Sequence, residues 1–262
     1  MKVILSLITF SLILGFTACT DKTYIEEPAS VNTTMDVNFK LAYDGQPLVY
    51  LDEYAYGAAK IKFSKVNFYL TNISLTKADG TDVPIKDVIY VDFSDLNNSL
   101  AGAEAGATFT LSDVPSGQYI GLKCGIGLDS ILNSKHPSDY PSTNPLSQSF
   151  NYWDAWNSYI FSKLEGRVDY NNDGTFESSF AYHTGLTELY KPISYSRQFK
   201  VGRTSAESQN LPNRFTIDIK EILFNEIGEP VNVAVHPSSH NPNEVHFADY
   251  IITQFSKALK LL

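Results

Sequence analysis

Apolar side chains recur at every second position in several short stretches of this chain, and this period is the strongest constraint on its fold. Residues 37–43 alternate apolar and polar side chains, and the apolar members of 120–126 share one face in the same way. A period of two is typical of a β-strand with one face against a core. Turn-forming pairs such as Asp44-Gly45 separate these runs at short intervals. We therefore predict an all-β fold, a Greek-key or immunoglobulin-like β-sandwich.

Three further stretches refine this prediction. The apolar pattern of residues 61–70 changes parity at Ser64-Lys65, which indicates a β-bulge or a bend. The small residues 101–106 carry no packing signal and are predicted to form a loop. Near the C-terminus the apolar period changes to three or four residues, which predicts one amphipathic helix. The apolar residues with this spacing are Phe247, Ile251, Ile252, Phe255, Leu259 and Leu262.

The N-terminus has the pattern of a bacterial lipoprotein signal. Lys2 precedes an apolar run over residues 3–16, and two small residues then precede Cys19. We expect residues 1–18 to be a signal peptide and Cys19 to be lipidated, which would anchor the protein to a membrane of the bacterial cell envelope, in the periplasm or at the outer-membrane surface. A plain secreted protein is the alternative.

The rest of the chain is predicted to be a flexible tether over residues 19–34 and one domain over residues 35–262. Apart from the lipidation site, Cys124 is the only thiol of the mature chain, so the domain contains no intramolecular disulfide and depends on its core. The net charge of −9 comes with no cluster of lysine and arginine, which argues against nucleic-acid binding.

No enzyme motif is present. The sequence lacks a Gly-x-Ser-x-Gly elbow, a His-Glu-x-x-His pair, a phosphate-binding glycine loop and a Cys-x-x-Cys pair. We therefore expect a protein that is not an enzyme. Glycoside hydrolysis, which would use Asp154 and Glu165 as its two carboxylates, is the enzymatic alternative.

One acidic segment has the composition of a calcium loop. Asp169, Asn171 and Asp173 offer oxygen ligands at alternate positions, and a glycine and then Glu177 follow. The glutamate comes earlier than in an EF-hand. An ordinary hairpin turn explains the same Asn-Asp-Gly sequence, and we favour the turn over calcium binding.

Histidines and tryptophans gather in the middle of the chain. Both tryptophans, Trp153 and Trp156, lie between His136 and His183. Imidazole nitrogens beside oxidisable aromatic rings suit copper or another late transition metal. The alternative is that the indoles belong to the core and the histidines are capped or solvated. Three more histidines lie within residues 236–246, where the prolines favour a solvated loop over a zinc or copper site.

Several motifs, in the same order along the chain, resemble the MbnP-like family, which is named for the methanobactin partner protein. The similarity runs from about residue 35 to residue 260. The motifs that carry it are residues 63–75, 91–93, 117–127 and 144–146, the pair Tyr152-Trp153, Phe161, and residues 182–185.

This resemblance implies an extracytoplasmic β-sandwich that binds copper and serves in copper acquisition or handling. His136 and His183 match the family's histidines and are the expected metal ligands, and Trp153 matches its first tryptophan. In such proteins a tryptophan can be oxidised to kynurenine by a dihaem partner related to cytochrome c peroxidases. Trp153 is the candidate for this modification, and Trp156 is expected to line the same site.

A binding module of another kind is the main rival to a copper protein. The side chains of Tyr152, Trp153, Trp156 and Tyr159 would form an exposed aromatic platform in a non-catalytic adhesion or glycan-binding domain. Such a platform would stack on sugar rings.

Overall fold

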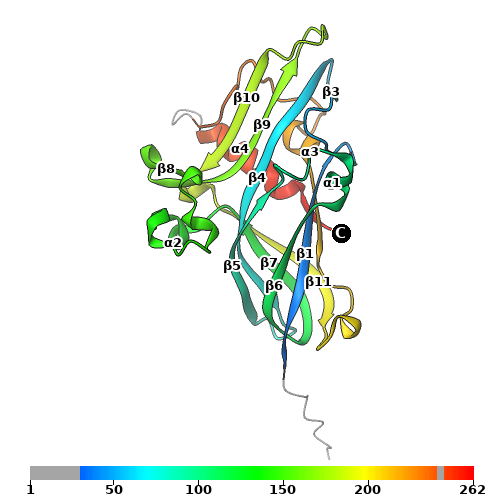
Figure 1. Cartoon of the computed structure of the whole chain (residues 1–262), viewed down its shortest axis with the longest axis vertical. Coiled ribbons are helices and arrows are strands. Elements are labelled where there is room, and N and C mark those ends of the chain that lie inside the picture. Colours follow the sequence, from blue (N-terminus) through cyan, green and yellow to red (C-terminus); the bar gives the residue numbers. More distant parts are fainter. Residues whose placement is uncertain (1–29, 241–244) are drawn as a thin grey trace, which may run out of the picture.

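The computed structural model describes residues 30–240 and 245–262. Two sheets pack face to face, which confirms the predicted β-sandwich (Figure 1). The smaller sheet has the order β13-β12-β1-β2, with β6 paired to β1. Its strands are β1 (Asn32–Tyr43), β2 (Gln46–Pro47), β6 (Ala107–Pro115), β12 (Arg214–Asp218) and β13 (Leu259–Leu261).

The larger sheet has the order β10-β9-β4-β7-β11, with β3 and β5 paired to β4 and β8 paired to β9. Its strands are β3 (Tyr54–Tyr56), β4 (Ala59–Thr76), β5 (Asp82–Asp92), β7 (Gly117–Ile126), β8 (Tyr152–Trp153), β9 (Ser158–Asp169), β10 (Ser178–Gly185) and β11 (Lys191–Val201).

Alternating side chains of the two sheets meet in an aromatic core. In β1 the side chains of Val37, Phe39, Leu41 and Tyr43 are all buried, as their period predicts. The Phe39 ring stacks on Phe215 of β12 at 4.9 Å between centroids and meets Phe68 of β4, in the other sheet, edge-on at 6.1 Å. The predicted bulge in β4 is confirmed, because the pairing with β9 shifts register between Phe63 and Lys65.

The predicted C-terminal helix is α4 (Val245–Ala258), which crosses behind β9 and β4 in the view of Figure 1. Its Ile251, Ile252 and Phe255 are fully buried, and the Phe255 ring lies 5.1 Å from that of Phe68. The helix is shorter than its apolar period suggested. Leu259 begins β13, because the chain pairs there with β12 instead of continuing the helix.

Two other boundaries also differ from the sequence prediction. The stretch predicted as a loop contains α1 (Leu100–Ala105), where alanines favour helix, Ser99 caps the first turn and Ala103 is buried. The tether was expected to reach residue 34, whereas β1 already begins at Asn32, which pairs with Pro115 at the end of β6.

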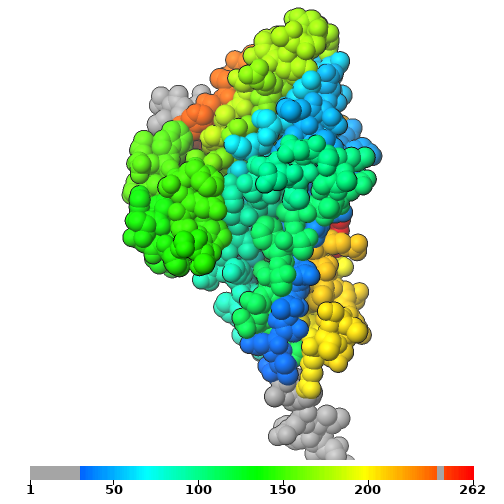
Figure 2. Space-filling view, in the orientation of Figure 1, coloured from blue at the N-terminus to red at the C-terminus, as the bar shows by residue number. Residues whose placement is uncertain are grey.

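The long connection between β7 and β9 builds a lobe on one side of the sandwich (Figures 1 and 2). It carries β8, the short helix α2 (Ser130–Asn133) and four 3-10 turns, of which the last is Asp154–Trp156. The remaining α-helix is α3 (Ile219–Leu223), capped by Asp218. Within the described ranges, no helix is both long enough and apolar enough to span a bilayer. The signal peptide, Cys19 and residues 19–29 of the tether lie outside the described residues.

Candidate metal centre

His183 and Glu165 are brought together by the antiparallel pairing of β9 with β10. His183 is opposite Lys163, so it lies on the same face as Glu165 two residues further along β9, the face that points away from the core. The Nε2 atom of His183 lies 2.8 Å from Oε1 of Glu165, and both side chains are largely covered. A carboxylate can only accept a hydrogen bond, so Nε2 carries a proton, and in the neutral ring Nδ1 of His183 keeps its lone pair.

The charge of Glu165 is stabilised in place. The hydrogen bond to His183 is the main influence that holds the pKa of this carboxyl below its usual range, and the Lys65 ammonium, 3.9 Å away, acts in the same direction. An ionised carboxylate on the remote nitrogen of an imidazole is the usual support of a metal-binding histidine.

Residues 237–240, in the segment before α4, lie along the free edge of β10. Ala181 forms a parallel bridge with Ser238, its amide donates to the Pro237 carbonyl at 3.0 Å, and the Ser239 hydroxyl donates to the His183 carbonyl at 2.7 Å. This register brings His240 beside His183, and their ring centroids are 5.3 Å apart. The solvated loop favoured from the prolines is therefore, in this part, a docked segment.

His240 is half-buried at this contact. Burial is the main cause that lowers the pKa of its imidazole, and the neighbouring His183 ring adds to the effect, so the ring is held uncharged. Its Nδ1 atom is buried and has no hydrogen-bond partner. The sequence shows three histidines in this region, but only the docking on β10 distinguishes His240 from the others.

The indoles lie next to this pair of imidazoles. Trp153 in β8 has its ring centroid 5.3 Å from that of His240, and it stacks on Trp156 at 4.5 Å with nearly parallel planes. Asn157 adopts the left-handed conformation that turns the chain from the Trp156 segment into β9. The predicted grouping of a histidine with the tryptophans is thus seen for His183, with His240 between them.

His136 lies against the neighbouring residue of β8. Its ring meets that of Tyr152 edge-on at 4.8 Å, and its Nε2 atom is 3.7 Å from the exposed Asp154 carboxylate. The Nδ1 atom is occupied, because it lies 2.9 Å from the Ser138 hydroxyl and caps the following 3-10 turn. Successive strand residues point to opposite faces, so His136 reaches Tyr152 on one side of β8 while His240 reaches Trp153 on the other.

The proposed four-ring platform does not form. Tyr159 is fully buried, and its hydroxyl donates to the Leu146 carbonyl at 2.8 Å. Tyr152 packs on the Tyr159 ring at 5.0 Å. Tyr152, Trp153 and Trp156 are partly exposed, but Tyr152 packs on a buried ring and the two indoles stack on each other, so the four rings do not share one exposed surface.

A buried lysine that sequence analysis did not single out anchors the tryptophan segment. Lys163 is 8% exposed, and its ammonium donates to Oδ1 of Asn151 at 2.7 Å and to the Phe150 carbonyl at 3.3 Å. Burial is the main cause that lowers the pKa of this lysine. Asn151 also donates to the hydroxyl of Tyr69. This network fixes the chain just before Trp153.

The candidate calcium residues do come together at the tip of the β9–β10 hairpin. The carboxylates of Asp169, Asp173 and Glu177 lie within 4.8 Å of one another, the only such group of three metal-binding side chains found in the described part of the chain. Buried Asp169 accepts hydrogen bonds from the amides of Asn172 and Gly174, and such bonds stabilise a turn without a metal ion. Calcium binding here stays a prediction.

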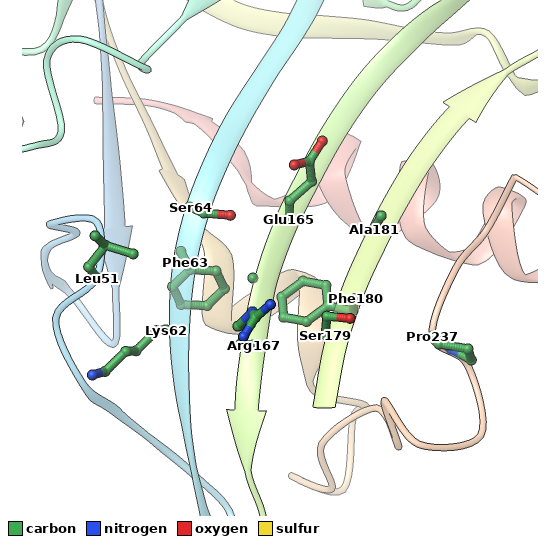
Figure 3. Close-up of a pocket in the computed structure, with 11 residues that line it drawn as sticks. Leu51, Lys62, Phe63, Ser64, Glu165, Arg167, Ser179, Phe180, Ala181 and Pro237 are labelled. Atoms are coloured by element: carbon green, nitrogen blue, oxygen red, sulfur yellow. The ribbon is translucent and has the colours of Figure 1, made fainter. Parts of the chain in front are cut away.

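A hollow of about 460 Å³ lies beside Glu165 on the outer face of β4, β9 and β10 (Figure 3). Gly166 contributes no side chain to its floor, and Pro237 of the docked segment forms one wall. Lys62 and Arg167 supply positive charge at its rim. Solvent and small solutes therefore have a route to the Glu165 carboxylate.

These features define a class of protein: a two-sheet β-sandwich with imidazoles and stacked indoles gathered on the outer face of its larger sheet. The chain belongs to the MbnP family, whose family model matches residues 32–245. The solved structure of MbnP from Methylosinus trichosporium is similar, with a TM-score of 0.50 and 17% identity over 73% of this chain and 78% of that chain. At 17% sequence identity, this structural similarity shows that the two proteins share a fold. No protein with a curated description is significantly similar to this chain.

Proposed function

We propose that this protein binds copper in the bacterial cell envelope and serves in copper acquisition or handling. Membership of the MbnP family supports the general role. The observation that carries the proposal is the pair of adjacent imidazoles, His183 and His240, beside Trp153. Imidazole nitrogens are good copper ligands, and an unpartnered nitrogen buried at this place fits a metal ion better than it fits an apolar core.

His183 is the first ligand that we propose, because Glu165 orients its ring and leaves Nδ1 for the metal. His136, the second ligand expected from the family resemblance, would have to use its Nε2 atom, since Nδ1 is bonded to Ser138. Bound copper would supply reversible metal storage and a redox-active ion next to an indole.

Two further parts of the proposal concern modification and location. Trp153 is the indole that we propose to be oxidised to kynurenine, by a dihaem partner related to cytochrome c peroxidases. Peptide mass spectrometry of protein from its native host tests this. Cys19 is proposed to carry the lipid anchor, and loss of membrane association in Cys19→Ala would support that assignment.

The central test is copper titration of the purified chain with and without His183. We expect one tightly bound copper ion in the wild type, and an affinity at least about 100-fold lower in His183→Ala, because loss of a ligand costs more than the 10–100-fold typical of a supporting residue. His246→Ala removes an exposed imidazole from α4 and serves as the control. Equal affinities of wild type and His183→Ala would refute the proposed site.

A further inference from the structure

A second imidazole reaches the same site from a part of the chain far away in sequence. Residues 237–240 lie along the free edge of β10, where Ala181 forms an isolated parallel bridge with Ser238. Two residues further along both segments this register pairs His183 with His240. Parallel neighbours in a sheet are about 4.8 Å apart, and the two ring centroids are 5.3 Å apart.

One nitrogen of His240 is available to a ligand. Its Nδ1 atom is buried and has no hydrogen-bond partner. In the neutral ring with the proton on Nε2, the lone pair lies on Nδ1, the buried atom.

In its neutral form His183 has the same free nitrogen. Its Nε2 donates to Glu165, so in that form its lone pair is also on Nδ1. Each neutral ring can thus offer Nδ1 to another partner. For His183, the carboxylate behind the remote nitrogen is the common support of a metal-binding histidine.

The spacing of the rings suits one shared ion. A late transition metal lies about 2 Å from each histidine nitrogen, so two nitrogens that share an ion are at most about 4 Å apart. The ring centroids lie 5.3 Å apart with their planes at 28° to each other, so a shared ion requires the two side chains to turn until their Nδ1 atoms converge. The Trp153 ring also contacts His240, with its centroid 5.3 Å away.

We propose that Nδ1 of His240 is a ligand of the same copper ion as Nδ1 of His183, so that the metal ties the segment before α4 to the edge of β10. This inference rests on the copper-binding function proposed above. It adds a ligand that the family resemblance does not supply and that the sequence places 57 residues beyond His183. Copper would therefore stabilise the contact between residues 237–240 and the edge of β10, in addition to filling a binding site.

The test uses His240→Gln in the full chain, with His246→Ala as the matched control. Glutamine is a poor copper ligand, and the backbone hydrogen bonds of the docked segment, from the Ala181 amide to Pro237 and from the Ser239 amide to Ala181, do not involve the substituted side chain, so the ligand nitrogen is lost while these bonds remain. We expect the copper affinity of His240→Gln to fall at least about 100-fold. The electron paramagnetic resonance spectrum of its Cu(II) form should show coupling to one fewer imidazole nitrogen.

Hydrogen exchange gives an independent measurement. Copper should slow exchange of the Ala181 and Ser239 amides, which hold the segment on β10, in the wild type and in His246→Ala but not in His240→Gln. Suppose that His240→Gln keeps the copper affinity, the nitrogen coupling and the amide protection of the wild type, while His183→Ala binds copper weakly. This result would overturn the His240 assignment and leave the copper function standing. A wild type that binds no copper would refute the proposed function itself.

Discussion

The β9–β10 hairpin carries two groups of metal-binding side chains, and they differ in how their polar atoms are satisfied. At its tip, the ligand oxygens of the acidic group come from nine consecutive residues, and Asp169 is already bonded to the backbone of its own turn. Along its body, His183 meets His240 from a distant segment, and the buried Nδ1 of His240 has no partner. The hydrogen bonds of Asp169 to its own turn account for its burial, whereas a buried imidazole nitrogen without a hydrogen-bond partner indicates a missing ligand.

The largest expected effect concerns the buried hydrogen-bond network of Lys163 and Asn151, which fixes the tryptophan segment beside the imidazoles. Asn151→Ala removes the closest acceptor of the buried Lys163 ammonium and a partner of Tyr69, so we expect a loss of about 3 kcal/mol in unfolding free energy. Urea denaturation measures this loss. Asn98→Ala, at an exposed asparagine, is the control and should change stability by less than about 0.5 kcal/mol. Similar losses in both variants would show that the buried network is not the anchor of the tryptophan segment.

The second expected effect separates the support of His183 from its role as ligand. Glu165→Gln keeps an acceptor for Nε2 but removes the negative charge, so copper affinity should fall about 10–100-fold. Competition with a chelator of known affinity measures this change. Glu53→Gln alters an exposed glutamate that pairs with Lys60 and should bind copper like the wild type. An unchanged affinity in Glu165→Gln would mean that the ring is oriented by packing alone.

The smallest expected effect is at the hairpin tip. If the acidic group takes up calcium weakly, calcium near its dissociation constant should raise the thermal unfolding midpoint by about 1 °C. Asp173→Asn should abolish this increment, and Asp52→Asn, at an exposed aspartate elsewhere, should preserve it. A calcium-dependent rise of the same size in all three proteins would assign the effect to general screening and leave the tip as an ordinary turn.

Local patterns predicted the fold well wherever neighbouring residues decide the structure. The period-two burial of residues 37–43 and the bulge near Ser64 follow from side chains a few positions apart. The helix over Leu100–Ala105 was missed because small side chains give no amphipathic period, although alanine and the Ser99 cap favour a helix. The C-terminal helix was predicted too long because Leu259 continues its apolar period while pairing in β13.

The candidate site was only partly predictable for the same reason. The sequence placed both indoles between His136 and His183, and the structure brings one of these histidines, His183, into the cluster that contains Trp153. The family resemblance could not reveal His240, because nothing near that residue in sequence indicates which strand it meets. Nor could composition show that Tyr159 is buried, which removes the four-ring platform.

By itself, the sequence of this protein determined its strands, its core faces, its C-terminal helix and its membership of one family, because these depend on side-chain period and on the order of motifs. The tertiary structure alone decided which imidazoles face each other. A parallel pairing between β10 and a segment more than fifty residues away sets that register, and hydrogen bonds between distant backbone groups leave no period in the sequence.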